Sequence, residues 1–249
     1  MIPEVGLFFN NQLFRGNRTS KVNAIEFDAF ESPNLCPLVK MGIKSEVSWS
    51  KIWRPTDIAP FNVHKIIDSS VVTFRIFPGI SESTLGAFLS VPEITGVVLE
   101  TFGSGNAPNN RPELLNILKN ACDKGIVIVN ISQCKKGLVS DLYATGRALA
   151  DIGIVPGSDM TSECALAKLA YLLGKYPNQP AKVRELMRTN MRGELTILEV
   201  KQQFTYFISH GFASSIKILL KTNDSEEIEG ENESAALEKS LVPMVKWEC

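Results

Sequence analysis

Apolar runs recur along the middle of the chain and stand out against the more polar segments between them. The runs Val71–Phe77, Gly96–Phe102 and Ile126–Ser132 are short and rich in β-branched residues, as strands are. The third, IVIVNIS, is apolar and β-branched along most of its length, which is typical of a strand buried on both faces. The pattern therefore predicts three sheet-forming segments between residues 71 and 132.

Segments with helical spacing follow these strands. SESTLGAFLS has Ser81 as an N-cap, and RPELLNILKNACDKG follows Asn110, which can cap it, and ends at Gly125. After a short strand and turn at IVPGSDM, TSECALAKLAYLLGK predicts a helix from about Thr161 to Leu173. Strands that alternate with helices in this way favour βαβ units, a parallel sheet and right-handed crossovers.

The two ends of the chain differ from this middle part. A short strand is predicted at Val5–Phe9. Residues 11–70 are punctuated by Gly, Pro and Asn, with a half-buried strand predicted at Val47–Trp53. Because the first of these strands lies almost at residue 1, we expect an upstream part of the fold to be missing. Residues 179–220 predict further helix, and residues 222–240 are acidic and poor in aromatics, which predicts a solvated linker or disordered tail.

Charge and cysteine usage narrow the function classes. The 26 basic and 27 acidic residues nearly cancel, so nothing favours nucleic acid or a membrane surface over a small polar ligand. Five scattered cysteines without a C-x-x-C pair, and only two histidines, give no reason to expect a zinc site. The sequence shows no 18-residue apolar span and no signal-like N-terminus, so a cytoplasmic protein is the simplest interpretation.

Ligands gather beyond the carboxyl ends of parallel strands, and three loops of this sequence should lie there. In the first loop, Gly103 and Gly105 permit positive φ and close backbone approach, and Asn106 offers an amide donor and an acceptor. This combination suits a small zwitterion or an amide, whereas the alternative is a tight strand-to-helix turn with a capping asparagine. The three loops expected beyond the carboxyl ends of the strands are Gly103–Asn110, Ser132–Thr145 and Gly157–Thr161.

The other two loops carry weaker signals. Cys134 could be a nucleophile, but no histidine lies near it in sequence, so we expect a small buried thiol. Tyr143 can reach into a pocket or pack in the core, and the sequence leaves both open. In the third loop, Asp159 or Thr161 as a helix N-cap explains most of the pattern.

Several stretches together resemble the type I (cytosolic) L-asparaginases, in their animal form, over roughly residues 1 to 196. Those similar to the C-terminal half are VVLETFGSGNAP, GIVIVNISQCKKG, YATGRALADIGIVPGSDMTSECALAKLAYLLG and MRGELT. The stretch similar to the later part of the N-terminal domain is PEVGLFFNNQLFRGNRTSKVNAIEFDAFESPNLCPLVKMG.

The resemblance implies an asparaginase-like α/β fold. Residues 1–70 would be the remnant of an incomplete N-terminal α/β domain with its linker, residues 71–200 a smaller parallel-sheet α/β C-terminal domain, and residues 201–249 a helical extension with an acidic tail. The implied reaction is hydrolysis of L-asparagine to L-aspartate and ammonia through a threonine nucleophile, with no metal and no organic cofactor.

The family's catalytic threonines lie in T-G-G-T and H-G-T-D motifs, and the sequence contains neither. The nearest string, RPTDIAP, is interpreted as a linker turn. We therefore expect a truncated chain that supplies no catalytic residue and is inactive alone.

In the family, each active site forms between the N-terminal domain of one subunit and the C-terminal domain of a neighbour. The resemblance thus implies that Asn106 and Tyr143 are substrate-binding residues lent to a neighbouring subunit, within a homo-oligomer or a complex with full-length asparaginase subunits. The alternative is a non-catalytic assembly partner, and a third reading is a small-ligand binder that reuses the C-terminal domain. Glu100 stands where bacterial relatives carry an arginine of an allosteric site, which speaks against that regulation here.

Overall fold

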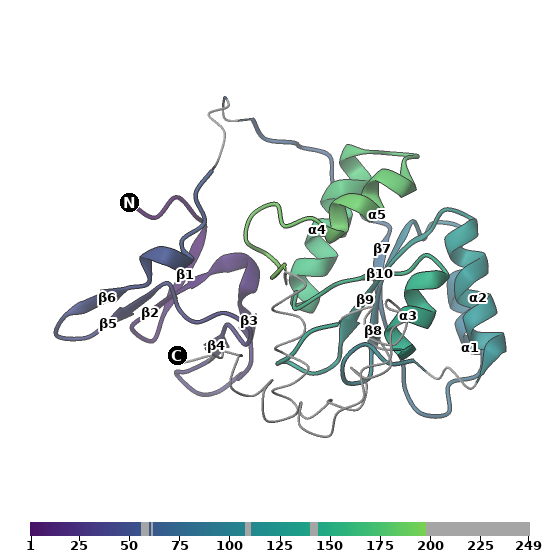
Figure 1. Cartoon of the computed structure of the whole chain (residues 1–249), viewed down its shortest axis with the longest axis horizontal. Coiled ribbons are helices and arrows are strands. Elements are labelled where there is room, and N and C mark those ends of the chain that lie inside the picture. Colours follow the sequence, from purple (N-terminus) through teal and green to yellow (C-terminus); the bar gives the residue numbers. More distant parts are fainter. Residues whose placement is uncertain (56–59, 61, 108–110, 140–143, 198–249) are drawn as a thin grey trace, which may run out of the picture. The chain divides into compact units, whose positions relative to one another are not determined.

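Four parallel strands form the sheet that the hydrophobic pattern predicts, in the order β10-β9-β8-β7 (Figure 1). The computed structural model describes residues 1–55, 60, 62–107, 111–139 and 144–197. The IVIVNIS run is confirmed as a strand buried on both faces, since its first five strand residues are all buried. The strands are β7 (Val71–Arg75), β8 (Gly96–Thr101), β9 (Val127–Ser132) and β10 (Val155–Pro156).

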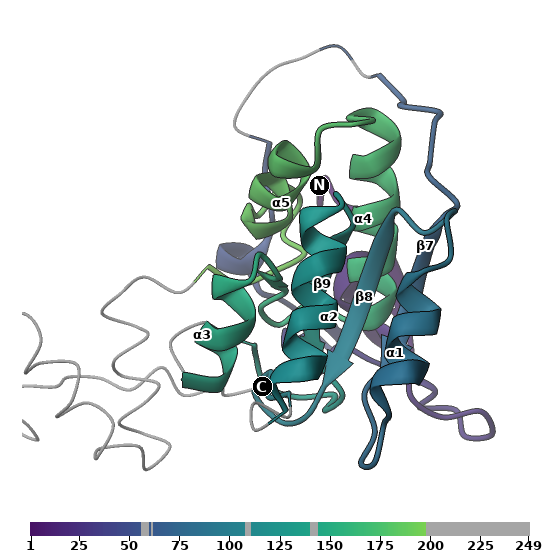
Figure 2. The same cartoon turned by 90° about the vertical axis from the view of Figure 1, so that its right-hand side faces the viewer.

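Helices cover both faces of this sheet, so the C-terminal part has three layers (Figure 2). Along β8, Val97 and Leu99 face one apolar core, and Val98 between them faces the other. The first core is closed by α1 (Glu82–Leu89), α2 (Pro112–Asp123) and α3 (Ala144–Asp151). The second is closed by α4 (Ser162–Lys175) and α5 (Pro180–Arg188).

The helix starts confirm two predicted caps and correct a third. The hydroxyls of Ser81 and Thr161 accept the backbone N–H groups three residues on, as N-caps do. Helix α2 instead has Arg111 at its N-cap position, with Pro112 next, so the predicted Asn110 cap is wrong. The guanidinium of Arg111 reaches back to the Ile80 carbonyl and the Glu82 carboxylate, which ties α2 to α1. Asn110 itself lies outside the described residues.

The first 53 residues form a small antiparallel sheet in the order β1-β2-β5-β6, with a separate two-stranded ribbon, β3 and β4. The strand predicted over Val47–Trp53 is wrong, because the chain leaves the sheet after Val47 and makes a 3-10 turn, η2 (Trp49–Lys51). The elements are β1 (Gly6–Phe9), β2 (Gln12–Arg15), η1 (Gly16–Arg18), β3 (Ser20–Lys21), β4 (Phe30–Glu31), β5 (Val39–Met41) and β6 (Ser45–Val47).

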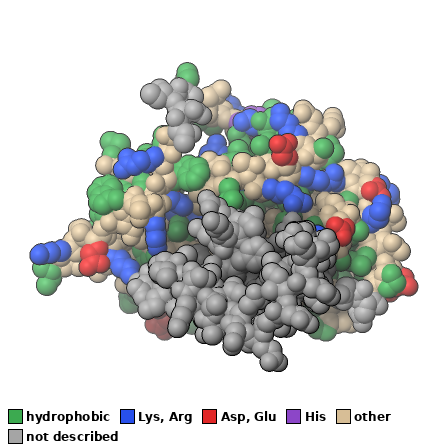
Figure 3. Space-filling model, viewed as in Figure 1, with side chains coloured by type: hydrophobic (Ala, Val, Ile, Leu, Met, Phe, Trp, Pro, Cys, Tyr) green, Lys and Arg blue, Asp and Glu red, His purple; other side chains and the backbone are tan. Residues whose placement is uncertain are grey.

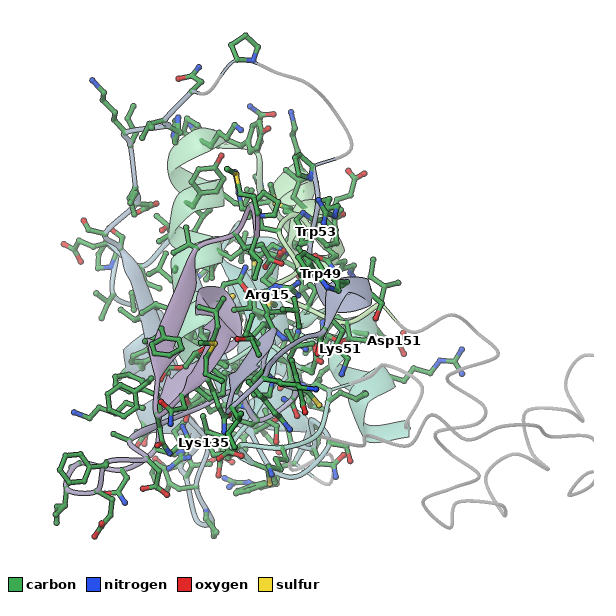
Figure 4. The ribbon with its side chains drawn as sticks, turned by 90° about the vertical axis from the view of Figure 1, so that its left-hand side faces the viewer. Arg15, Trp49, Lys51, Trp53, Lys135 and Asp151 are labelled. Carbon is green, nitrogen blue, oxygen red and sulfur yellow. The ribbon has the colours of Figure 1, made fainter. Side chains whose placement is uncertain are left out.

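Buried arginines attach this N-terminal segment (residues 1–53) to the C-terminal part. Arg15 donates to the carbonyls of Gly193 at 3.0 Å and Lys51 at 2.6 Å, and it pairs with Glu4. Figure 4 shows Arg15 near Trp49 and Lys51 of the turn η2 and near Trp53 just beyond it. Contacts of this kind lie within one compact unit, Met1–Thr196.

The N-terminal segment exposes much apolar surface. Figure 3 shows apolar side chains, in green, gathered on the side where Figure 1 places its strands. The large apolar residues that it exposes are Met1, Val5, Phe8, Val22, Ile25, Phe27, Met41, Ile43 and Trp49.

Candidate functional site

The loop after β8 is a tight turn closed by backbone hydrogen bonds between Phe102 and Asn106. The backbone of Asn106 pairs with that of Phe102 in both directions, at 2.8 and 2.9 Å, and the Gly105 N–H also donates to the Phe102 carbonyl. Both backbone polar groups of Asn106 are therefore used within the turn. This fixes the point from which its half-buried side chain leaves the backbone.

Two glycines in this turn have left-handed backbone conformations, with φ +50° at Gly103 and +102° at Gly105. Gly105 is further confined by its neighbours: a Cβ there would lie 2.6 Å from Cγ1 of Val139 and 3.1 Å from Nδ2 of Asn130. Gly105 was predicted to allow close approach of another group, and it does so. The approaching group is Val139, in the loop after β9.

Asn130 supports the turn from inside the sheet. It is 2% exposed, lies in β9, and donates from Nδ2 to the Gly105 carbonyl at 3.0 Å. Its Oδ1 accepts from the hydroxyl of the buried Thr101 at 2.6 Å. Ser132, at the end of β9, donates to the Gly103 carbonyl at 2.5 Å. Side chains of the neighbouring strand thus hold both glycine carbonyls, so the turn is set before any ligand arrives.

The other predicted residues of the strand-end loops have mixed outcomes. Cys134 is exposed, so the expectation of a buried thiol there is wrong. Its N–H donates to the Ser132 hydroxyl, which turns the chain outward directly after β9. Tyr143 lies outside the described residues, so its predicted role stays a prediction.

Asp159 is not a helix cap but one half of a buried ion pair. Its carboxylate accepts from both terminal nitrogens of Arg18, at 2.8 and 2.5 Å, and the two residues are 5% and 2% exposed. The same carboxylate accepts from the backbone N–H and the hydroxyl of Thr196. Sequence reasoning missed this pair, because nothing in local spacing links residues 18 and 159.

A second buried pair lies in the wall of a cavity lined by residues of η1 and α4. Lys168 lies 2.7 Å from the Glu194 carboxylate and also donates to the carbonyls of Met187 and Thr189. Burial by itself raises the pKa of Glu194, but Lys168 and the N–H groups of Met191 and Arg192 outweigh it, and the pKa falls below its usual value.

The cavity is about 340 Å³ and runs beside the exposed residues of α4. The two carboxylates in its wall already have partners: Glu194 has Lys168, and Glu163 accepts from the Ser20 hydroxyl at 2.9 Å. Asn106 does not line it. The cavity therefore belongs to the seam of the fold rather than to the loop site after β8.

Glu100 is also engaged within the chain. Its carboxylate pairs with Arg75 of β7 at 3.0 Å and accepts from the Ser162 hydroxyl at 2.7 Å. It therefore serves as a link between β7, β8 and the start of α4. Among the described residues, no group of three or more His, Cys, Asp or Glu could hold a metal ion, and no helix is long and apolar enough to cross a membrane.

Comparison with known proteins supports the resemblance. Residues 70–187 match the family described as Glutaminase/Asparaginase C-terminal domain, and residues 1–53 match Asparaginase, N-terminal. An L-asparaginase of Dirofilaria immitis is 44% identical over 226 residues, covering 88% of this chain and 38% of its own length. The human 60 kDa lysophospholipase is 42% identical over 244 residues, covering 98% of this chain and 41% of its own length.

Among solved structures, L-asparaginase I from Vibrio cholerae superposes with a TM-score of 0.73 at 44% identity. The match covers 79% of this chain and 58% of that one. The chain thus spans between about two-fifths and three-fifths of the length of these relatives.

Proposed function

Because the chain belongs to the asparaginase family, we propose that these 249 residues form one wall of an L-asparagine hydrolase pocket and do not hydrolyse the amide by themselves. The observation that carries the proposal is the turn at Gly103–Asn106, which presents Asn106 from a backbone held by Asn130 and Ser132. A rigid support of this kind is what a substrate-positioning amide needs.

The attacking group would come from elsewhere. The resemblance places the family's nucleophile in T-G-G-T and its second threonine in H-G-T-D, and the 249 residues contain neither string. Removing the nucleophile from such a constellation commonly lowers the rate by ~10⁴-fold or more. The sequence also lacks G-x-S-x-G, so it gives no support to serine esterase chemistry.

The exposed apolar surface of the N-terminal segment favours assembly with other asparaginase subunits. Phe8 of β1 is 58% exposed, and Ile25 and Phe27 on the β3–β4 connection are about 90% exposed. Apolar side chains in these positions gain most when a partner covers them. In the alternative form of the proposal, the chain is a non-catalytic partner that lends Asn106, and with it Tyr143, to a full-length subunit.

The first test is ammonia release from L-asparagine by the purified chain. We expect none above the blank over hours, in a coupled assay that detects a full-length relative at nanomolar concentration. Turnover by the chain alone, abolished by a point substitution within these residues, would contradict the proposal, because the catalytic group would then lie within them.

The second test is complementation. A full-length L-asparaginase, disabled at the asparagine of its own Gly-x-Gly-Asn loop, is refolded together with this chain, and co-assembly is checked by affinity capture. We expect ammonia release to return with the wild-type chain and with the exposed helix variant Asn116→Ala, but not with Asn106→Ala. Failure to co-assemble refutes the partner role, and co-assembly without rescue refutes the role of Asn106.

A further inference from the structure

Asn34 bridges the two loops that follow β9 and β10. Its Oδ1 accepts the Gly137 N–H at 2.9 Å, and its Nδ2 donates to the Asp159 carbonyl at 3.2 Å. The bonds connect residues 103 and 125 positions apart in the chain. A single side-chain amide of the N-terminal segment therefore contacts the loops after β9 and β10 of the C-terminal sheet.

The backbone of Asn34 is itself held in place. The buried guanidinium of Arg18 donates to the Asn34 carbonyl at 3.2 Å while it binds the Asp159 carboxylate, and Ser32 donates to the Arg18 carbonyl at 3.0 Å. Because the backbone of Asn34 is held, the two hydrogen bonds of its side-chain amide fix Gly137 and Asp159 relative to the N-terminal segment.

The loop that Asn34 holds packs against the candidate site. Two residues beyond Gly137, Val139 pairs with Ser158 through its backbone, and its Cγ1 would lie 2.6 Å from a Cβ at Gly105. Gly105 is the residue before Asn106. Displacement of Gly137 would move Val139 and remove the side chain that confines the turn.

We propose that Asn34 is a positioning residue: through Gly137 and Val139 it sets the turn that presents Asn106. The identity of the pocket rests on the proposed function, but the mechanical coupling does not. Asn34 itself would not contact the substrate. Through it, the N-terminal segment would set the position of the pocket wall that does contact the substrate.

The first experiment is hydrogen–deuterium exchange on the purified chain. Asn34→Ala should speed exchange in a peptide spanning residues 133–139 about fivefold, the effect expected when one hydrogen bond is lost. Asn34→Asp keeps the acceptor for Gly137 but loses the donor to the Asp159 carbonyl, so exchange there should lie between wild type and Asn34→Ala. Asn116→Ala, an exposed asparagine on α2, is the control. Unchanged exchange in Asn34→Ala, with an unchanged Tm, would overturn the proposal.

The second experiment uses the complemented enzyme. Asn34→Ala should raise the KM for L-asparagine about fivefold, leave co-assembly intact and change kcat little, because the pocket wall moves while the nucleophile does not. Asn34→Asp should restore much of the lost affinity. An unchanged KM in Asn34→Ala contradicts the coupling. If the wild-type chain gives no rescue, the proposed function fails, and the exchange experiment still decides the role of Asn34.

Discussion

Replacing Asp159 by asparagine removes one charge from the buried pair that joins the N-terminal segment to the C-terminal part. The change keeps the side-chain shape but leaves Arg18, which is 2% exposed, without its counter-charge. The carboxylate also accepts two bonds from Thr196, at 2.8 and 2.7 Å, one on each oxygen, and the amide nitrogen that replaces one oxygen in the substitute cannot accept the bond made there. The perturbation therefore acts on one buried charge and its hydrogen bonds.

The expected loss follows from the burial of both partners. Removing one member of a buried, hydrogen-bonded pair costs about 3–5 kcal/mol, since the remaining charge stays desolvated. For a unit of this size each kcal/mol lowers Tm by about 2–4 °C, which gives a fall of about 10 °C. Replacing both partners with apolar residues, as in Arg18→Met with Asp159→Leu, should cost less than the single change.

The assay is urea unfolding followed by tryptophan fluorescence, with circular dichroism as a second probe. Asp123→Asn is the matched control, because Asp123 pairs with Lys119 on the surface of α2 and its side chain is 60% exposed. That control should lose no more than about 0.5 kcal/mol. If Asp159→Asn loses less than about 1 kcal/mol, the pair does not hold the two parts together, and the reasoning from its burial is wrong.

Three further predictions test the turn, a buried carboxylate and the thiols. Gly105→Ala should lower the free energy of unfolding in urea by about 1–3 kcal/mol. The control Gly79→Ala, where a Cβ meets no described atom within 4 Å, should lose only the cost of its backbone strain. Equal losses in the two variants would argue against close packing at Gly105. Because the pKa of Glu194 is lowered on folding, the carboxylate stabilises the fold at pH values above the ordinary pKa of 4.5, and this stabilisation is lost as pH falls through the folded-state pKa. Glu194→Gln should make the free energy of unfolding less dependent on pH in that range. An unchanged slope would contradict this. Iodoacetamide at neutral pH should label the exposed Cys134 well before Cys122, because burial raises the pKa of the Cys122 thiol to about 11; mass spectrometry gives the order, and equal rates would contradict it.

The secondary structure of the C-terminal part was predictable because its signals are local. Apolar runs gave β7, β8 and β9, and hydroxyl caps gave the starts of α1 and α4. Predictions failed where a local pattern has more than one solution. The alternation over Val47–Trp53 suits a strand, but the chain turns back on itself at Ser48, where the Lys51 N–H finds its acceptor.

The candidate site was only half predictable. The glycines and Asn106 are visible in the sequence, because few residue types tolerate positive φ and few offer an amide at such a turn. The groups that hold the turn are not visible. Asn130 is a polar residue within the apolar run IVIVNIS, and its hydrogen bond to Gly105 forms only when β8 and β9 lie side by side.

The sequence by itself determined most elements of the C-terminal part, their order and the resemblance to the family, since periodicity, caps and motifs are properties of neighbouring residues. Tertiary structure decided which polar groups meet. Arg18 finds Asp159 across 141 positions, and Asn34 finds Gly137 across 103. Hydrogen bonds and buried ion pairs act over a few ångströms, so they form only after the fold has brought distant segments together.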